Sequence, residues 1–368
     1  MEPLPERLDD LMTPAAIVDL DRMEANLDRM ASYAASHGLR LRPHPKTHKS
    51  PLLAAEQIRR GATGVTVATL HEARVMAGAT DDILLAHPPV GHAKLERLVA
   101  LPESARLTVA LDSRDALDAL ARAAAAAGRP IGVLIEIDLG MHRVGEGDPR
   151  TVAALARHAA SLPCIEWRGI LFYPGHIREH VDAQADALAH ADQTLAQHLA
   201  ALAEEGLEPE TVSAGSTPTA FASHRIHGLT EIRPGTYIFK DRTTAAMGAC
   251  AWDDCAYTVL ATVVSVAVPG QAVVDAGSKA LAREEIRGTD APGFGALLDR
   301  PDVHVRAMSE EHGILHLAGT DWRPRVGDRV RIVPNHVCVS VNLHPRVLGV
   351  RGSTVELAWP VVARGWDG

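Results

Sequence analysis

The chain has 368 residues, more than one typical domain, so two domains and a large buried core are expected. Its formal net charge of −9 argues against a nucleic-acid partner or an anionic membrane surface, and no apolar run approaches the roughly 20 residues that a membrane-spanning helix requires. The N-terminus lacks the basic-then-apolar order of a signal peptide, and the 4 cysteines do not suggest a disulfide framework, so a cytoplasmic protein is expected.

Short apolar runs alternate with longer helical patterns from residue 39 onward. The strand-like runs are residues 39–42, 64–68, 83–86, 107–111, 131–137, 169–173, 211–214 and 231–233. The segments between them, such as 113–127 and 180–205, are rich in alanine and leucine at helical spacing. Strand–helix–strand order at this spacing favours parallel pairing, and eight such units predict a (β/α)8 barrel. An open doubly wound sheet is the alternative, but no GxGxxG sequence follows the first run.

Valine and isoleucine dominate after residue 250, in the runs 257–268, 326–333 and 347–357. Turn signals recur between them at Pro269-Gly270, Gly327-Asp328 and Arg351-Gly352. These patterns predict a separate antiparallel β domain, with which the early strand-like run at 15–20 is a candidate to pair. The expected division is a barrel over residues 20–245 and a β domain made of residues 1–19 and 246–368.

Residues 42–49 read Arg-Pro-His-Pro-Lys-Thr-His-Lys and follow the first barrel strand. Barrel enzymes carry their active sites at the C-terminal ends of the strands. A lysine placed there among other cationic groups can act as a neutral amine and form a Schiff base, which makes Lys46 a candidate catalytic residue. The alternative is a basic loop without a chemical role.

Other distinctive residues follow later strands of the same predicted rim. His176, in the sequence Tyr173-Pro-Gly-His176 after strand six, is a candidate acid or base, with a structural loop histidine as the alternative. Glycine and hydroxyl residues after strands seven and eight, at 214–218 and 233–237, suit phosphate binding by backbone amides and hydroxyls. A plain loop is the alternative for these glycines. Together with a lysine after strand one, they predict a site for pyridoxal phosphate (PLP).

The sequence Pro334-Asn335-His336-Val337-Cys338 carries a second candidate site. If it continues a strand, alternation places His336 and Cys338 on the same face. An imidazole and a thiolate side by side can bind zinc or a similar divalent ion and leave positions open for substrate. The alternative is a buried cysteine beside a core histidine.

These pieces together resemble the fold-type III PLP enzymes of the D-threonine aldolase and D-serine dehydratase family, over Thr13 to Gly365. The resemblance is carried by the sequences RPHPKTHK (42–49), GVTVATLHEARVM (64–76), DLGMHRVG (138–145), FYPGH (172–176), EIRPGTYIFKD (231–241), VVDAGSK (273–279), SEEHG (309–313) and PNHVCVSVNLH (334–344). It implies an alanine racemase-like barrel that carries PLP, and a β domain that supplies a metal-ligand pair. It also implies a homodimer with a shared active site.

The resemblance also implies roles for individual residues. Lys46 corresponds to the Schiff-base lysine and Cα base, Arg143 to the arginine that faces the pyridine nitrogen, and Tyr173 to the residue beside the cofactor ring. His336 and Cys338 correspond to the ligands of a divalent metal, Mn²⁺ or Zn²⁺. The residues that correspond to the phosphate cradle and its neighbour are Gly215, Ser216, Thr217, Gly235, Thr236 and Tyr237.

The family carries out two reactions on D-3-hydroxy-α-amino acids. The His-x-Cys pair resembles the dehydratases, which act on D-serine or D-3-hydroxyaspartate. The segments 231–241 and 334–344 are closer to the D-threonine aldolases, so retro-aldol cleavage to glycine and an aldehyde is expected, with dehydration as the alternative. An amino-acid racemase and a non-catalytic PLP-binding protein are less well supported. Arg178 is interpreted as a solvated loop arginine rather than as a partner for a second substrate carboxylate. Asp241, Asp275 and His312 are left as candidate partners behind the site.

Overall fold

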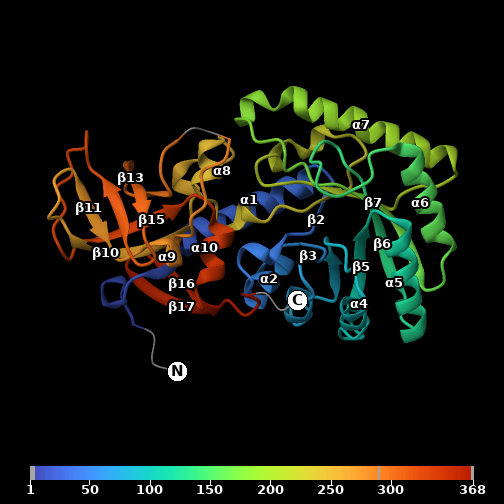
Figure 1. The fold of residues 1–368 in the computed structure, drawn as a ribbon, viewed down its shortest axis with the longest axis horizontal. Coiled ribbons are helices and arrows are strands. Elements are labelled where there is room, and N and C mark those ends of the chain that lie inside the picture. The colour runs from blue at the N-terminus through green and yellow to red at the C-terminus, as the bar shows by residue number, and fades with distance from the viewer. Residues whose placement is uncertain (1–4, 289–290, 366–368) are drawn as a thin grey trace.

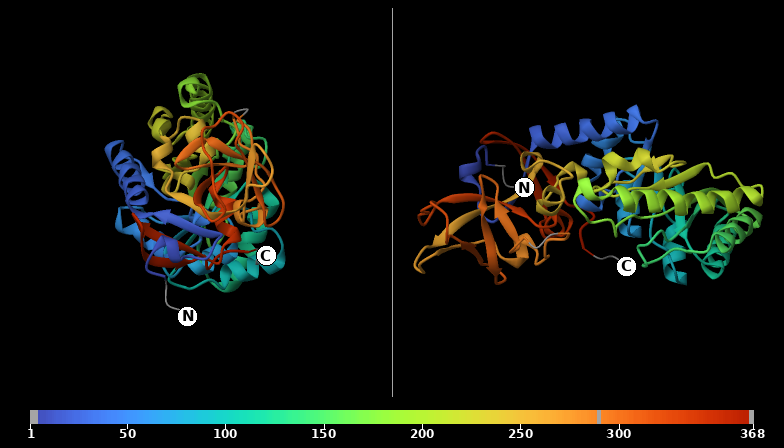
Figure 2. Two further views of the ribbon diagram at one scale, coloured as in Figure 1. Left: turned by 90° about the vertical axis from the view of Figure 1, so that its left-hand side faces the viewer. Right: turned by 90° about the horizontal axis from the view of Figure 1, so that it is seen from above.

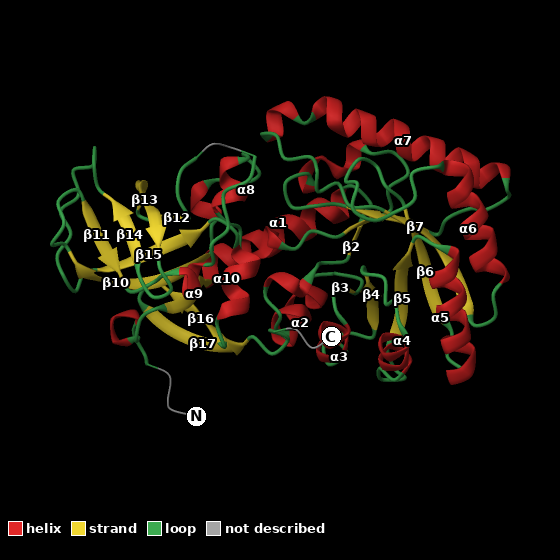
Figure 3. Ribbon diagram, viewed as in Figure 1, coloured by secondary structure: helices red, strands yellow, loops and turns green. Residues whose placement is uncertain are grey.

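The computed structural model describes residues 5–288 and 291–365, which form two domains lying side by side (Figure 1). A parallel sheet surrounded by helices makes up one, and a compact β structure makes up the other, as Figure 3 shows by element type. Within the described residues, no helix has both the length and the apolar character needed to cross a membrane.

Eight parallel strands form the first domain. Their order in the sheet is β2-β9-β8-β7-β6-β5-β4-β3, and backbone hydrogen bonds from Thr63 N to Leu41 O (2.9 Å) and from Thr66 N to Pro43 O (2.8 Å) join the two ends. The sheet is therefore closed, which confirms the predicted barrel and excludes the open doubly wound alternative. The strands are β2 (Arg40–Leu41), β3 (Val65–Val67), β4 (Asp82–Leu85), β5 (Arg106–Leu111), β6 (Ile131–Glu136), β7 (Ile165–Leu171), β8 (Thr211–Ala214) and β9 (Glu231–Ile232).

Amphipathic helices cover the outside of this barrel. In α5, Leu117, Leu120, Ala121 and Ala124 are buried at helical spacing, and the helix ends at Gly128, whose φ of 61° suits a residue without a Cβ. The barrel helices are α1 (Leu20–Ser36), α2 (Pro51–Arg59), α3 (Leu70–Met76), α4 (His92–Val99), α5 (Arg114–Ala127), α6 (Pro149–Ser161) and α7 (Ala185–Glu204).

Two elements differ from the boundaries expected from the sequence. Strand β7 begins at Ile165, four residues before the predicted run, because a register shift at Gly169 interrupts the apolar alternation. Gly169 has a φ of 138°, and a Cβ there would lie 2.0 Å from Thr211 O, so only glycine allows β8 to pair at this point. Helix α7 begins at Ala185 because residues 181–183 form a separate 3₁₀ turn.

The second domain contains a closed six-stranded antiparallel barrel, in the order β10-β11-β14-β13-β12-β15, with β15 pairing back to β10. Strand β1 (Ala15–Asp19) extends this sheet, pairing antiparallel with β10 and parallel with β16, so one pairing departs from the expected antiparallel arrangement. The other strands are β10 (Tyr257–Ser265), β11 (Gln271–Val274), β12 (Gly295–Leu297), β13 (Arg300–Met308), β14 (Gly313–His316), β15 (Arg329–Pro334), β16 (Arg346–Arg351) and β17 (Thr354–Pro360). Three short helices complete the domain: α8 (Arg242–Ala246), α9 (Ser278–Leu281) and α10 (Val337–Leu343).

One hydrophobic cluster holds the two domains together. It includes Leu41 and Tyr237 from the barrel and Val259 and Val337 from the β domain, all nearly or completely buried. Figure 2 shows the β domain set at one end of the barrel rather than wrapped around it. The helix α10, at the edge of the β domain, therefore has a defined position beside the loop that follows β2.

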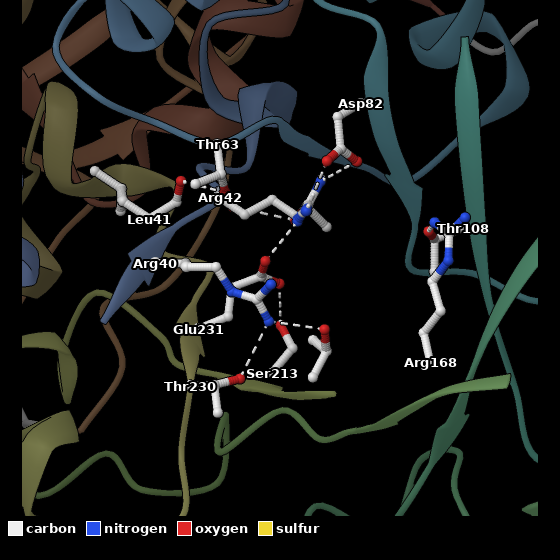
Figure 4. Close-up of polar contacts among 12 residues, drawn as sticks. Arg40, Leu41, Arg42, Thr63, Asp82, Thr108, Arg168, Ser213, Thr230 and Glu231 are labelled. Atoms are coloured by element: carbon white, nitrogen blue, oxygen red, sulfur yellow. Dashed lines mark hydrogen bonds and ion pairs between the residues drawn. The ribbon is translucent and has the colours of Figure 1, made fainter. Parts of the chain in front are cut away.

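The barrel interior is layered, with an ionic layer at the N-terminal end of the strands (Figure 4). Arg42 lies between two buried carboxylates, at 2.6 Å from Asp82 and 2.8 Å from Glu231. A Cβ at Gly64 or Gly132 would meet an arginine side chain at 2.5 Å, so these inward-facing glycines leave room for the guanidinium groups. The next layer is apolar and consists of Leu84, Ala110, Leu134 and Leu171. Beyond this layer the barrel opens toward the β domain.

Candidate active site

A cavity of about 500 Å³ lies between the C-terminal ends of the barrel strands and the helices α8 and α10 of the β domain. Most of the predicted site residues line it, although they come from segments spread over almost 300 positions of the chain. The predicted residues on its wall are Lys46, Arg143, Tyr173, Ser216, Thr217, Gly235, Thr236, His336 and Cys338.

Lys46 and Arg143 meet at the ring of Tyr173. The Lys46 Nζ atom lies 5.9 Å from the ring centroid, and the Arg143 Cζ atom lies 5.2 Å from it. The ring has this position because Gly175 has no side chain: a Cβ there would come within 2.1 Å of a ring carbon. The loop that carries Arg143 is fixed by Asp138, whose carboxylate accepts hydrogen bonds from the backbone of residues 140 and 142. An aromatic face thus stands beside an amine and a guanidinium.

The loops after β8 and β9 form a cradle for an anion. The buried hydroxyl of Thr217 has no hydrogen-bond partner in the described part of the chain, which marks a position for a ligand oxygen. A Cβ at Gly235 would lie 3.0 Å from Thr47 Oγ1 and 3.1 Å from His44 O, so a larger residue would crowd this wall. Gly215, with a φ of 107°, makes the turn that brings Ser216 and Thr217 to the cavity without lining it itself.

His336 and Cys338 lie together, but not on a strand as predicted. Strand β15 ends at Pro334, His336 is the N-cap residue of α10, and Cys338 lies in the first turn of this helix. The alternation argument was therefore wrong, although the two side chains interact. The Thr47 hydroxyl lies 3.2 Å from Cys338 Sγ, which brings the pair next to the loop of Lys46. The predicted pair thus faces the lysine across the boundary between the domains.

Electrostatic interactions favour the charged forms of this pair. Burial opposes the thiolate, but the adjacent His336 and Lys46 outweigh burial and hold the pKa of Cys338 below its ordinary value. Burial likewise opposes the imidazolium, but Cys338 and Asp241 raise the pKa of His336 well above its ordinary value. A thiolate is the form of cysteine that binds metal ions, and a metal would displace the imidazole proton.

Asp241 orients His336. The fully buried carboxylate accepts a hydrogen bond from His336 Nδ1 at 3.1 Å, which leaves Nε2 as the ring nitrogen for a metal. Burial opposes its charge, but His336 and nearby backbone amides keep the pKa of Asp241 below its usual range. The other two residues predicted to lie behind the site are found elsewhere. Asp275 accepts a hydrogen bond from Thr13 within the β domain, and His312 is exposed.

Besides Gly215, two predicted residues are absent from the cavity lining. The described lining includes Gly175 and Ile177 but not His176, whose ring packs against Gly140, at 3.1 Å from the position that a Cβ there would take. Its buried Nδ1 atom has no hydrogen-bond partner among the described residues, so a structural hydrogen bond is not seen there and the role of His176 as an acid or base stays a prediction. The ring of Tyr237 is buried in the interdomain cluster, and its hydroxyl accepts a hydrogen bond from Gln57 at 2.9 Å, so its side chain braces the cradle from behind.

Three buried ionisable residues on the cavity wall were not assigned from the sequence: His44, Glu136 and Arg233. Each has a side-chain atom without a hydrogen-bond partner among the described residues, namely His44 Nδ1, Glu136 Oε2 and Arg233 Nε. Burial raises the pKa of Glu136, while burial and the neighbouring Lys46 and Arg233 hold the pKa of His44 well below its ordinary value. The only sequence signal was their position at the ends of β2, β6 and β9.

These features fit PLP and a divalent ion. The unpartnered Thr217 hydroxyl and the glycine-lined wall suit a phosphate, Tyr173 offers an aromatic face, and Arg143 and Arg233 offer guanidinium groups for polar atoms of a ring. No cluster of three or more His, Cys, Asp or Glu suited to a metal occurs in the described ranges, so a structural four-ligand zinc site is excluded there. The His336–Cys338 pair would leave further positions on an ion to water or substrate.

Comparison with known proteins gives consistent matches over almost the whole chain. The family model described as "Alanine racemase, N-terminal domain" matches residues 18–243, and the "Putative serine dehydratase domain" matches residues 256–350. The D-threonine aldolase of Arthrobacter sp. is 33% identical over 363 residues, which cover 96% of this chain and 93% of that protein. The D-threo-3-hydroxyaspartate dehydratase of Delftia sp. (strain HT23) is 38% identical over 379 residues, covering 97% and 98%.

Solved structures agree with these matches. The D-threonine aldolase from Filomicrobium marinum superposes with a TM-score of 0.88 at 38% identity, covering 99% of this chain and 98% of that one. A variant of D-threo-3-hydroxyaspartate dehydratase with a cysteine replaced by alanine, solved in a metal-free form, superposes with a TM-score of 0.90 at 35% identity. The coverage is 98% of this chain and 100% of that one.

Proposed function

Because the chain belongs to the family of the alanine racemase N-terminal domain, joined to a putative serine dehydratase domain, we propose that it is a lyase dependent on PLP and a divalent metal. Its substrates would be D-3-hydroxy-α-amino acids, and the reaction would be retro-aldol cleavage. The observation that carries the proposal is the meeting of Lys46, Tyr173 and the His336–Cys338 pair in one cavity between the domains. The relatives that match along its length are aldolases and dehydratases, which are lyases.

Lys46 would hold the aldehyde carbon of the cofactor, and the cradle after β8 and β9 would hold its phosphate. Thr217 Oγ1 and Ser216 are the hydroxyls available there, and Gly235 and Thr236 supply the facing wall. Arg143 was expected to face the ring nitrogen, but the buried Arg233, with its free Nε, competes with it for this role. PLP supplies an electron sink for the electrons released when a bond to Cα breaks.

His336 and Cys338 would hold the divalent ion, which supplies Lewis acidity at the β-hydroxyl oxygen of the substrate. Cysteine-to-alanine substitution in a dehydratase relative accompanies a metal-free form, which supports a cysteine ligand in this family. A thiolate ligand favours zinc over manganese, so of Mn²⁺ and Zn²⁺ we propose Zn²⁺ as the better fit.

In retro-aldol cleavage the β-hydroxyl loses its proton, the Cα–Cβ bond breaks, and Cα receives a proton. D-Threonine would give glycine and acetaldehyde, with all atoms accounted for. Lys46 is the residue placed to hold and return the proton at Cα, since its side chain lies beside Tyr173 on the cavity wall. Burial and the neighbouring Lys46 hold the pKa of His44 well below its ordinary value, which favours the neutral imidazole beside the lysine.

Dehydration is the second candidate. In that reaction Lys46 would remove the Cα proton, hydroxide would leave from Cβ, and D-threonine would give 2-oxobutyrate and ammonia. The specific observation in its favour is the cysteine of the ligand pair, the residue type altered in the metal-free structure of D-threo-3-hydroxyaspartate dehydratase. Overall identity does not separate the two candidates, since aldolase and dehydratase relatives both reach 38%.

The deciding experiment is to incubate the protein with D-threonine, PLP and either Zn²⁺ or Mn²⁺ and to identify every product. Glycine with acetaldehyde would establish the aldolase, whereas 2-oxobutyrate with ammonia would establish the dehydratase. Conversion of D-threonine to L-allo-threonine, its epimer at Cα, without either pair of products would reject both in favour of a racemase.

Two controls test the residues. Lys46→Ala should abolish both the visible absorbance of bound PLP and turnover, while the circular dichroism stays that of the wild type. Removal of metal by a chelator should abolish turnover but keep the absorbance of the cofactor. Full activity after complete metal removal would return His336 and Cys338 to the interpretation as core residues.

We further propose a cytoplasmic homodimer that shares its active sites. All 4 cysteines are free thiols, which suits a reducing compartment. The cavity is lined by both domains, a second subunit would complete it, and the oligomeric state can be measured by sedimentation of the PLP-loaded protein.

A further inference from the structure

The loop that carries Lys46 is tightly wound. Lys46 is the middle residue of a single 3₁₀ turn (Pro45–Thr47), and the backbone N–H groups of His48 and Lys49 both donate to Pro45 O, at 3.0 and 2.7 Å. Lys49 then adopts a φ of 52°, a left-handed conformation that is uncommon for a residue with a side chain. Because such a conformation persists only where surrounding contacts hold it, the contacts of Lys49 help to fix the loop three residues after Lys46.

A buried ion pair holds the Lys49 side chain. Its Nζ atom lies 3.1 Å from Glu72 Oε1, and the two side chains are 12% and 1% exposed. The other carboxylate oxygen of Glu72 accepts a hydrogen bond from Ala68 N at 2.7 Å, and Ala68 lines the same cavity as Lys46. Glu72 N in turn donates to the hydroxyl of Thr69, the N-cap residue of α3. The ion pair therefore joins the loop that carries Lys46 to the loop that follows β3.

A segment of the β domain contacts the same lysine. Residues 361–365 follow β17 and return from the β domain to the barrel (Figure 1). The carbonyl oxygen of Lys49 accepts a hydrogen bond from Ala363 N at 3.1 Å, and Lys49 Nζ donates to Ala363 O at 3.2 Å. Ala363 belongs to the hydrophobic cluster of the barrel, whereas Val361 belongs to the cluster that holds the two domains together. Both the backbone and the side chain of Lys49 are thus fixed by the β domain as well as by the barrel.

We propose that Glu72 and Lys49 are positioning residues that hold the Lys46 amine at the cavity, with the segment 361–365 as their support from the β domain. This inference rests on the proposed function and adds residues that act on the ligand only through Lys46, since neither is among the described residues that line the cavity.

The physical reason is the cost of a buried charge without a partner. An unpaired ammonium group is strongly unfavourable in the interior, so without Glu72 the Lys49 side chain would turn toward solvent, and the turn that carries Lys46 would lose its support. A displacement of about 1 Å at a reacting group can lower a rate about 100-fold, so a small shift of this turn is enough to be measured.

The test replaces Glu72 by glutamine and measures how fast the full-length protein, freed of PLP, binds added PLP. Glutamine can still accept from Ala68 N, but it then turns its NH₂ group toward the Lys49 ammonium. In Glu72→Gln the rate constant for appearance of the visible absorbance of bound PLP should fall at least tenfold. For the reloaded protein, kcat with D-threonine should also fall at least tenfold, while KM stays within threefold of the wild type.

Variants of the partner lysine test the pair from its other side. Lys49→Met should slow the binding of PLP as much as Glu72→Gln does, and the double variant should be no slower than the slower single one, because the two residues act through one contact. Lys49→Arg, which keeps the charge and the N–H donors, should restore most of the rate.

Asp82→Asn is the matched control. Asp82 is also a buried carboxylate in an ion pair, with Arg42 at 2.6 Å, but it is the first residue of β4 and lies at the opposite end of the barrel. Urea unfolding should show that Asp82→Asn and Glu72→Gln both lose stability, whereas only Glu72→Gln should bind PLP more slowly.

Three results would overturn the inference. A rate of PLP binding and a kcat within threefold of the wild type in Glu72→Gln would show that the ion pair does not position Lys46. Equal slowing in Asp82→Asn would point to a general loss of stability, and a rise in KM with unchanged kcat would assign the pair to substrate binding.

Failure of the proposed function would look different. If the wild-type protein binds PLP but does not consume D-threonine, the reaction is wrong, and the rates of PLP binding still test the positioning residues. If the wild-type protein does not bind PLP, the proposed function and this inference fail together.

Discussion

Replacing Asp241 by asparagine should weaken metal binding without removing the cofactor. Four donors point at this carboxylate: Thr244 N and Thr244 Oγ1 at Oδ1, and His336 Nδ1 and Val337 N at Oδ2. Asparagine replaces one oxygen by an NH₂ group, so whichever way the amide is placed, one pair of donors loses its acceptor. Either His336 loses the partner that orients it, or the N-cap of α8 behind it is lost.

The expected magnitude follows from the position of Asp241 behind the ligand. Loss of such a partner typically reduces metal affinity about 10- to 100-fold, which corresponds to about 1.4 to 2.7 kcal/mol of binding free energy. The distance of 3.1 Å between His336 Nδ1 and Asp241 Oδ2 and the complete burial of the carboxylate favour the upper part of this range. The hydrogen bond between Asp241 and His336 does not involve Lys46, so the absorbance of PLP bound to this lysine should change little.

The assay is competition for Zn²⁺ between the PLP-loaded protein and a chromophoric chelator, with the cofactor absorbance recorded in the same cuvette. Asp275→Asn is the matched control, because Asp275 accepts hydrogen bonds from Thr13 and Thr262 inside the β domain, away from the cavity. A zinc affinity of Asp241→Asn within threefold of the wild type would refute the reasoning. So would an equal loss in both variants, because that would point to general destabilisation of the β domain.

Three further predictions concern stability and the cofactor. Arg42→Ala should lower the free energy of unfolding by about 3 to 5 kcal/mol, because the buried Glu231 loses its ion-pair partner and the buried Asp82 keeps only Arg106. Arg106→Ala, whose side chain is 62% exposed, should cost at most about 1 kcal/mol; urea unfolding that gives equal costs would contradict this. In the folded protein burial lowers the pKa of His48 to about 4, whereas in the unfolded chain it has the ordinary value of 6.5. Between these pH values the unfolded chain binds a proton that the folded protein does not, so the free energy of unfolding should decrease as the pH falls, by about 2 kcal/mol at pH 5. This pH dependence should be smaller in His48→Gln, and unfolding curves of both proteins at pH 7.5 and 5 check it. Gly235→Ala should weaken PLP binding at least tenfold, because the added methyl group would crowd Thr47; an unchanged dissociation constant in an absorbance titration would show that the wall can yield.

Much of the fold was predictable because it is written in local patterns. The eight runs that form β2 to β9 are short, apolar and separated by helical periodicity, and all eight pair in the barrel. The boundary of β7 was missed because Gly169 breaks the alternation of apolar residues. A glycine is required at this position by the close approach of the neighbouring strand β8, which the residues around Gly169 do not reveal. The strand expected at His336 and Cys338 was wrong because the valine-rich pattern around them also suits a short buried helix.

The candidate site was likewise predictable only in part. Position after a barrel strand predicted Lys46, Tyr173 and Thr217, since the ends of parallel strands meet at one rim whatever the loops do. The same argument singled out His176, whose role stays a prediction: a position on the rim does not determine the direction of a side chain, and this ring packs against Gly140.

By itself, then, the sequence determined the barrel, the β domain and the strand ends where chemistry would lie, because backbone preference and hydrophobic period act over a few neighbouring residues. Only the tertiary structure decided which side chains share the cavity: Asp241 behind His336, and the buried Glu136 and Arg233. These contacts join residues up to about a hundred positions apart, and they depend on how the two domains pack, for which a local pattern carries no signal.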